Sequence, residues 1–584
     1  MARSEKQLLA KTAQQMSAGK FSSAVKTAQI GMKSYPKSPA FCSAAGLASA
    51  QMGLHKKAAD YFVRTLSVAA NSVETQDNLV QALVLAGDVD KALAYSSKFL
   101  AADSNRDAQH YLRAMAYLQI GRPDLAEPEA ARAHKIAPTK MRNLKMLAET
   151  QSAAGFYEDA ATTYANLAKL HPDETQFVIE QSNMHVRAGD IPGAKDVMTA
   201  ARELRSGAAD MIGHLANLHM MTGDADAAEA CFVQQSDIDP VAGAAWFGRA
   251  SLAKTETAEK LLVQLCQNAS QASGNDHNSA LMHFGLAELA RKTADGSLEE
   301  SALQTANAIE AARRPYDQRA AIAEIEQLCA IDFTTPNDAS QHQPIFILGL
   351  PRSGTSLLER MIGAHPDVTQ LGEFEGGQRV LNAVRAASSL HVSAMELTNL
   401  YLGARKAVSE TAIFTDKLPA NYKVIGALRA ALPRARFIHL TREPNDIALS
   451  TWRNYFAQTG MDYAFDINAM AHVFNLYKRY MRHWDQIAGI DILQVAYEDL
   501  VTRPQETTQT IAAHCGLTWS DEMARPETSD AAILTASAVQ ARQKVHLRSV
   551  GGGAAFPVIR DTFRPKLDPA LWEMGASNSI SRKT

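Results

Sequence analysis

The sequence is short of cysteine, of long apolar runs and of net charge, and each shortage excludes a class of protein. Five cysteines are scattered among 584 residues without a CxxC pair, which argues against a disulfide framework or a zinc site and predicts reduced thiols. No apolar run approaches the roughly 20 residues of a membrane span, and the polar opening MARSEKQLLAKTAQQ lacks the apolar core of a signal peptide. A net charge of −3 gives no basis for nucleic-acid binding. These features predict a cytoplasmic protein without a membrane span or a nucleic-acid partner.

Two small residues recur every 34 positions through the first 242 residues, and the chain is long enough for two or more domains. In each repeat a glycine stands five residues before an alanine: Gly19/Ala24, Gly53/Ala58, Gly87/Ala92, Gly121/Ala126, Gly155/Ala160, Gly189/Ala194 and Gly223/Ala228. This is the period of tetratricopeptide (TPR) repeats, in which the glycine permits the turn between two helices and the alanine lets them pack closely. The pattern therefore predicts seven pairs of helices.

The seven repeats are expected at 5–38, 39–72, 73–106, 107–140, 141–174, 175–208 and 209–242. The TPR resemblance implies a right-handed superhelix whose concave face binds a protein partner or forms a homodimer, although such an array can also be a scaffold alone. From 243 to 332 the period breaks while the sequence stays helical. We expect degenerate repeats that cap the solenoid, with helices at 243–270, 278–293, 297–313 and 316–330. A polar linker, 333–343, then leads into a C-terminal domain, 344–584.

A glycine-rich turn follows the first clear strand pattern of this last domain. The apolar run Ile345–Leu350 enters the turn GLPRSGTS, and the residues after it are apolar at helical spacing. The N–H groups of such a loop and of the helix that follows favour a bound anion. Thr355-Ser356 occupies the place of the Walker A Lys-Ser/Thr, and Arg352 is the only cation inside the loop. A guanidinium binds phosphate or sulfate oxygens in two places without a metal. We therefore expect a metal-free site rather than an ordinary Mg-ATP site.

The string PRSGTSLLERM, followed by AHPDV, resembles the phosphosulfate-binding loop of the sulfotransferases that use 3′-phosphoadenosine 5′-phosphosulfate (PAPS), and especially the protein-tyrosine sulfotransferase branch. The resemblance extends from Pro344 to about Gly553. It implies a three-layer α/β domain with a parallel sheet. It also implies transfer of a sulfuryl group from PAPS to a hydroxyl, which leaves adenosine 3′,5′-bisphosphate (PAP). The residues that it implies for the 5′-phosphosulfate are Arg352, Ser353, Gly354, Thr355 and Ser356.

The same resemblance implies the catalytic residues. Glu373, in the string LGEFEGG, matches the general base that deprotonates the acceptor hydroxyl. Glu375 and His365 are rival candidates for that role. Lys417, in the string DKLP, matches a lysine that stabilises charge on the leaving phosphate, where Arg352 would assist it.

Residues for the other end of the donor follow two later strand patterns. The run ARFIHLT ends at Arg442, and Ser450 lies eight residues further on a helix that begins at Pro444 and has an apolar side that includes Phe456. In the resembling family this arginine and this serine hold the 3′-phosphate, which distinguishes PAPS from ATP. A third strand, Ile490–Tyr497, brings Tyr497, which either lines the nucleotide pocket or packs in the core.

The late basic stretch 535–548 contributes Ser537 and Arg542, which could reach the 3′-phosphate. The sequence departs from the family just beyond it, where Gly551-Gly552-Gly553 replaces a tryptophan or a lysine.

Two other functions remain open on sequence alone. A P-loop kinase or ATPase would use Asp416 as a Walker B acid. A TPR interaction protein with an inactive C-terminal domain would explain the triple glycine. The acceptor of a sulfotransferase is equally open, because a peptide or protein tyrosine, a saccharide, a lipid and a small metabolite would use the same machinery.

Overall fold

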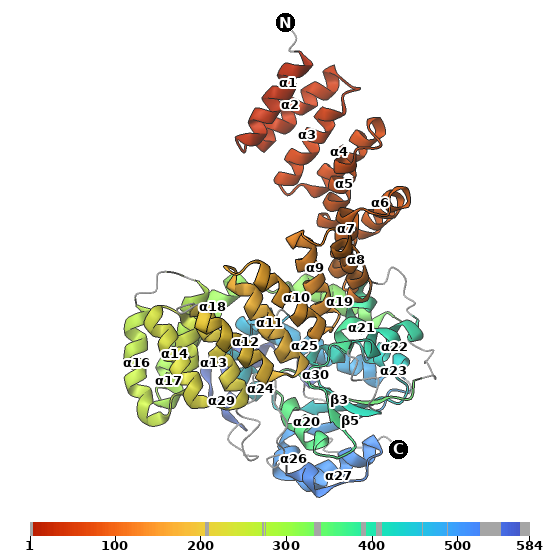
Figure 1. The fold of residues 1–584 in the computed structure, drawn as a ribbon. Helices are drawn as coiled ribbons and strands as arrows, with labels where there is room; N and C mark the ends of the chain where they lie inside the picture. The colour runs from red at the N-terminus through yellow and green to blue at the C-terminus, as the bar shows by residue number, and fades with distance from the viewer. Residues whose placement is uncertain are drawn as a thin grey trace. The chain divides into compact units, whose positions relative to one another are not determined.

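The computed structural model describes residues 4–204, 209–270, 274, 276–331, 340–386, 393–404, 412–457, 460–487, 489–525 and 550–572. The chain divides into two compact units, Met1–Ala188 and Gly189–Thr584. Helices dominate both units, and one five-stranded sheet lies in the second (Figure 1). The division falls at the turn glycine of the sixth repeat, so the repeats contribute to both units.

Fourteen helices occupy the seven repeats at the predicted positions, two to each repeat. They are α1 (Glu5–Ser17), α2 (Phe21–Ser34), α3 (Pro39–Gln51), α4 (His55–Val68), α5 (Val73–Leu85), α6 (Val89–Ala102), α7 (Asp107–Gln119), α8 (Pro123–Ile136), α9 (Met141–Ala153), α10 (Tyr157–Leu170), α11 (Thr175–Ala188), α12 (Ile191–Leu204), α13 (Ala209–Thr222) and α14 (Ala225–Ile238). The predicted pairs of helices are therefore present at the expected 34-residue spacing.

The recurring glycines end the first helix of each repeat. All seven have a left-handed backbone, with φ between +69° and +86°. At the first turn Gly19 N donates to Met16 O and Lys20 N to Gln15 O, the paired bonds that close a helix when a glycine follows it. The seven recurring alanines are at most 1% exposed. Their small side chains let the second helix of a repeat approach its neighbours closely.

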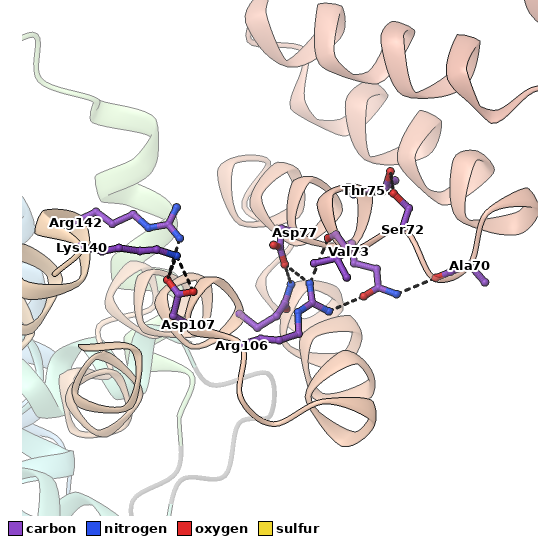
Figure 2. Close-up of polar contacts among 11 residues, drawn as sticks. Ala70, Ser72, Val73, Thr75, Asp77, Arg106, Asp107, Lys140 and Arg142 are labelled. Carbon is purple, nitrogen blue, oxygen red and sulfur yellow. Dashed lines mark hydrogen bonds and ion pairs between the residues drawn. The ribbon is translucent and has the colours of Figure 1, made fainter. Parts of the chain in front are cut away.

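Polar side chains join successive repeats in the first unit at the starts of their first helices (Figure 2). Arg106, which precedes α7, donates to Gln76 Oε1 at 2.6 Å and pairs with Asp77, both on α5. Lys140, one repeat later, donates to both carboxylate oxygens of Asp107 at 2.9 Å. Arg106 and Lys140, at equivalent positions of neighbouring repeats, thus form a ladder of bonds, each to the first helix of the preceding repeat.

Five further helices follow the repeats: α15 (Gly243–Leu252), α16 (Thr255–Ala269), α17 (His277–Lys292), α18 (Gly296–Arg313) and α19 (Gln318–Cys329). The single helical segment expected at 243–270 is thus two helices. Lys292 stabilises the break, because its Nζ donates to three carbonyls at the end of α15, those of Ala250, Ser251 and Ala253, at 2.7–2.9 Å. The lysine satisfies backbone groups that the helix end leaves open.

The sheet is parallel throughout, with strand order β2-β3-β1-β4-β5. Its strands are β1 (Gln343–Leu348), β2 (Thr369–Gln370), β3 (Ile413–Asp416), β4 (Arg436–Thr441) and β5 (Ile492–Ala496). Alternate residues face opposite layers, so Phe346 and Phe437 belong to one core whereas Ile347 and Ile438 belong to the other. The predicted three-layer α/β domain with a parallel sheet is confirmed.

Helices cover both faces of the sheet (Figure 1). The first layer holds α21 (Gly376–Ala386), α22 (Ala394–Leu402), α23 (Ile425–Ala431), α24 (Pro444–Trp452) and α25 (Ile467–Asp485). The second holds α20 (Thr355–Gly363), α26 (Tyr497–Thr502) and α27 (Pro504–Cys515). The short helices α29 (Gly552–Ala555) and α30 (Pro569–Trp572) follow near the end of the described chain.

Helices α18 and α19 pack on the sheet domain, and their apolar residues share its larger core. Asn307 Nδ2 donates to Trp452 O at 3.0 Å, and Arg314 Nη1 donates to Phe456 O at 2.6 Å. These side chains satisfy carbonyls at and beyond the end of α24, which stops at Trp452. Phe456, predicted on that helix, therefore lies past its end. The expected linker 333–343 falls mostly outside the described residues.

Candidate active site

The predicted site residues follow the carboxyl ends of four adjacent parallel strands. The glycine-rich loop follows β1, Lys417 follows β3, Arg442 follows β4 and Tyr497 follows β5. In open parallel sheets ligands bind beyond the carboxyl ends of the strands, at the point where the strand order reverses. The topology therefore brings together residues that are far apart in the sequence.

The loop after β1 is curled tightly. Arg352 and Gly354 have left-handed backbones with φ of +73° and +105°. Such a conformation is uncommon for a residue with a side chain and marks a backbone held for a purpose. A Cβ at Gly349 would stand 2.6 Å from Ser353 Oγ, so a side chain at this position would displace that hydroxyl.

Two features of the loop suit an anion. Ser353 is fully buried, and its Oγ has no hydrogen-bond partner among the described residues. No described side chain caps the N-terminus of α20, which begins at Thr355, so the positive end of the helix dipole faces the loop. A phosphate or sulfate group fits this donor set.

Three residues predicted for the two ends of the donor meet at the loop. Arg352 Nε donates to Ser450 Oγ at 3.0 Å across 98 residues of sequence, and Arg442 Nη1 donates to Arg352 O at 2.9 Å. Burial, with a smaller contribution from the charge of Arg442, lowers the pKa of Arg352 to about 10. Arg352 thus stays charged at neutral pH, and the guanidinium of Arg442 is near enough for its charge to act on that of Arg352. Adjacent cations are stabilised by a multiply charged anion.

Tyr497 packs against both parts of the site. Its ring lies 4.5 Å below the guanidinium of Arg442 and fills the space next to Gly354, where a Cβ would come within 2.5 Å of the ring. The side chain is buried in the smaller core. Tyr497 also begins α26 rather than ending a strand. Of the two alternatives left open by the sequence, the geometry favours a packing residue that orients Arg442.

Glu373 and Lys417 form an ion pair. Lys417 Nζ donates to Glu373 Oε1 at 3.0 Å. The lysine side chain is 2% exposed whereas that of Glu373 is 40% exposed, so the carboxylate can meet an acceptor while the ammonium stays buried. The two residues predicted as base and charge stabiliser therefore stand within hydrogen-bond reach of each other.

Sequence reasoning missed Glu359, a buried carboxylate of α20. Its Oε1 accepts from Gly372 N at 2.9 Å and from Thr415 Oγ1 at 3.0 Å. Burial raises its pKa, and the charge of Lys417 opposes that rise. The available signal was its place on the apolar stripe of the helix beside Leu358 and Ile362, where a charged residue is rare.

His365, a rival candidate for the general base, has a structural role. Its Nδ1 accepts from Asp367 N at 3.2 Å, so Nε2 carries the proton that it donates to Thr518 O at 2.8 Å. Both ring nitrogens are occupied, and the side chain is buried. Glu375, the other rival, is half-buried and immediately precedes α21.

Asp416, the candidate Walker B acid, is fully buried at the end of β3. One oxygen accepts from Tyr401 Oη at 2.8 Å and the other from Leu418 N at 2.9 Å. Burial raises its pKa to about 7. A carboxylate that is enclosed in this way is badly placed to hold a magnesium ion. Among the described residues, no group of three or more His, Cys, Asp or Glu side chains is arranged to hold a metal.

The triple glycine docks on α24. Asp446, which is 4% exposed, accepts from Gly551 N at 2.7 Å and from Gly553 N at 2.8 Å. A Cβ at Gly553 would lie 2.2 Å from the carbonyl of Asn445, so only glycine fits there. Gly551 and Gly553 therefore have a structural role, which the sequence alone did not reveal. Ser537 and Arg542 lie outside the described residues.

Comparison with known proteins agrees with this geometry. Residues 344–521 match the model of the sulfotransferase family, and residues 78–140 and 145–209 match that of the tetratricopeptide repeat. No described helix has the length and hydropathy that crossing a bilayer requires.

The curated relatives are similar over part of the chain. An uncharacterized protein of Aquifex aeolicus is 30% identical over 36% of this chain and 30% of its own length. Protein-tyrosine sulfotransferase 1 of Danio rerio is 26% identical over 34% of this chain and 59% of its own length. The chain thus spans less than two thirds of either relative.

Among solved structures, the sulfotransferase domain of the Synechococcus PCC 7002 olefin synthase aligns at 19% identity with 38% of this chain and 90% of that domain, with a TM-score of 0.29. The family matches thus fall on two different regions of the fold: the sheet domain at 344–521 is similar to the sulfotransferase family, and the helices at 78–140 and 145–209 are similar to the tetratricopeptide repeat.

Proposed function

We propose that this protein transfers a sulfuryl group from PAPS to an acceptor hydroxyl. The observation that carries the proposal is the convergence of Arg352, Arg442 and Ser450, joined by hydrogen bonds of 2.9 and 3.0 Å. A donor with phosphate groups at both its 5′ and 3′ positions needs two cations that act on one molecule. An ATP site would need only one such cluster, together with a metal.

The loop residues fit the 5′-phosphosulfate. The buried and unpartnered Ser353 Oγ, the N–H groups of Gly354, Thr355 and Ser356, and the guanidinium of Arg352 would hold its oxygens. Arg442 and Ser450 would hold the 3′-phosphate, and Ser537 and Arg542 are further candidates for it. When bound, PAPS supplies the sulfuryl group and departs as PAP.

Glu373 and Lys417 would act as a coupled pair. Glu373 accepts the proton of the acceptor hydroxyl, which removes the negative charge that faces Lys417 Nζ at 3.0 Å. The ammonium is then free to stabilise the negative charge that builds on the leaving group, and Arg352 does the same from the loop. Because Lys417 is buried, its charge is poorly screened by water.

The helical repeats bear on the acceptor and on the protein partners. The repeats would bring a protein or peptide to the site, which favours a protein or peptide tyrosine over a saccharide or a small metabolite. A homodimer through the repeats is the alternative use of the same helices. All five cysteines are free, which suits the reducing cytoplasm that we propose as the location.

Titration calorimetry on the purified full chain tests the donor. PAP should bind without a metal, and ATP with magnesium should bind far more weakly. Incubation with isotopically labelled PAPS and a cell extract, followed by mass spectrometry, should then reveal labelled sulfated products. Tight, magnesium-dependent ATP binding without PAP binding would support a kinase or ATPase instead.

A further inference from the structure

The helix that follows the donor loop also reaches the acid–base side of the site. Glu359 lies on the second turn of α20, four residues after Thr355. Its side chain is buried, with the residue 6% exposed, and extends toward the end of β3 and the turn that precedes Glu373. A buried carboxylate is costly unless it is paired and hydrogen-bonded, so its presence here calls for a function.

Gly372 is held from both sides by this arrangement. Its N–H donates to Glu359 Oε1 at 2.9 Å, and its carbonyl accepts from Lys417 N at 2.9 Å. Its φ of +67° is one that side chains rarely adopt. The orientation of the next residue, Glu373, is therefore set by a glycine whose backbone N–H and carbonyl are both bonded.

The same oxygen, Glu359 Oε1, also accepts a hydrogen bond from a residue of β3. Thr415 Oγ1, the second donor to Glu359, is fully buried on β3, and Thr415 O accepts from Leu371 N at 3.3 Å. Lys417 lies two residues further along. One carboxylate thus ties together α20, which follows the loop of Arg352, the turn at 371–373, which contains Glu373, and the end of β3, which precedes Lys417.

We propose that Glu359 is a positioning residue, whose hydrogen bonds to Gly372 and Thr415 hold Glu373 and Lys417 in register with the donor loop. The inference rests on the proposed sulfuryl transfer. Glu359 acts through Gly372, and Glu373 remains the group that meets the acceptor. A displacement of the base by about 1 Å costs on the order of 100-fold in rate, which is the scale of the effect expected when the hydrogen bonds are lost.

Two variants of Glu359 separate the effect of the carboxylate's position from the effect of its charge. Glu359→Gln keeps an oxygen at the position of Oε1 and removes the charge, whereas Glu359→Asp keeps the charge and withdraws the carboxylate by one methylene. Glu506→Asp is the matched control, because that side chain is a glutamate on the helix α27 and is 70% exposed.

The experiment measures PAP affinity by calorimetry and the release of inorganic sulfate from PAPS, with water as the acceptor. We expect Glu359→Gln to release sulfate within about threefold of the wild-type rate and Glu359→Asp to be slower by 10-fold or more, with PAP affinity unchanged in both. The opposite order, or equal wild-type rates in both variants, would overturn the inference. Equal losses of PAP affinity would also overturn it. A wild-type chain that neither binds PAP nor releases sulfate would refute the proposed function itself.

Discussion

Replacement of Gly553 by alanine should detach the triple-glycine segment from α24. The added Cβ would stand 2.2 Å from the carbonyl carbon and oxygen of Asn445 and 2.6 Å from Asp446 N. Carbon atoms pack at about 3.5–4.0 Å, so the segment must retreat by more than about 1 Å. The obstacle is backbone, which cannot rotate out of the way as a side chain can.

The retreat breaks both hydrogen bonds to Asp446. Each bond joins a backbone N–H to a buried carboxylate, at 2.7 and 2.8 Å. Hydrogen bonds to charged groups contribute about 1.5–3 kcal/mol each, so the loss is about 3–6 kcal/mol of docking free energy. At about 1.4 kcal/mol for each factor of ten, the undocked population should rise by roughly 100-fold or more. The rest of the domain should stay folded, because local opening needs less free energy than global unfolding.

Hydrogen exchange measured by mass spectrometry over residues 550–563 is the assay. Gly552→Ala is the matched control, since its Cβ would meet only Leu449 Cδ2, at an ordinary 3.9 Å. PAP affinity should fall in Gly553→Ala and remain in Gly552→Ala, because α24 carries Ser450. Equal exchange in the two variants would refute the reasoning, and the triple glycine would then lose its structural explanation.

Two further predictions concern stability. Burial raises the pKa of Asp416 to about 7 from the usual 3.8, so the stability conferred by its neutral form is complete below about pH 4 and is lost as the pH rises to about 7. In Asp416→Asn the thermal unfolding midpoint of the second unit should no longer fall as the pH rises from 4 to 7. A fall equal to that of the wild type would show that Asp416 is not its source. Arg106→Ala removes the bonds to Gln76 and Asp77 and should destabilise the first unit by about 1–3 kcal/mol, measured by urea denaturation. Lys91→Ala, which breaks only an exposed pair, should leave the midpoint unchanged, and an equal shift in both variants would argue against the ladder.

The features that could be predicted from the sequence are those set by local rules. The 34-residue spacing of glycine and alanine places the fourteen helices because a left-handed turn needs glycine and close packing needs a small side chain. The strand, loop and helix at 343–363 could be predicted for the same reason, since each has its own periodicity and turn chemistry.

The features that could not be predicted depend on contacts between distant residues. The sequence pairs Arg442 with Ser450 and assigns Arg352 to the other end of the donor, and only the structure shows that Arg352 contacts both of them. The end of the first helix within 243–270 is stabilised by Lys292, some forty residues later. Asp446 was passed over because its partners, Gly551 and Gly553, lie more than a hundred residues away.

The central claim is that Arg352 and Arg442 act on one donor that carries a 3′-phosphate. The most direct test compares the affinities of PAP and AMP, which differ only in that phosphate, for the wild-type chain and for Arg442→Ala. Charge-assisted bonds to the phosphate predict that the wild type prefers PAP by roughly 10-fold to 100-fold or more and that Arg442→Ala loses most of this preference while it still binds AMP. Equal affinity of the wild type for PAP and AMP, or a preference that survives in Arg442→Ala, would contradict the account.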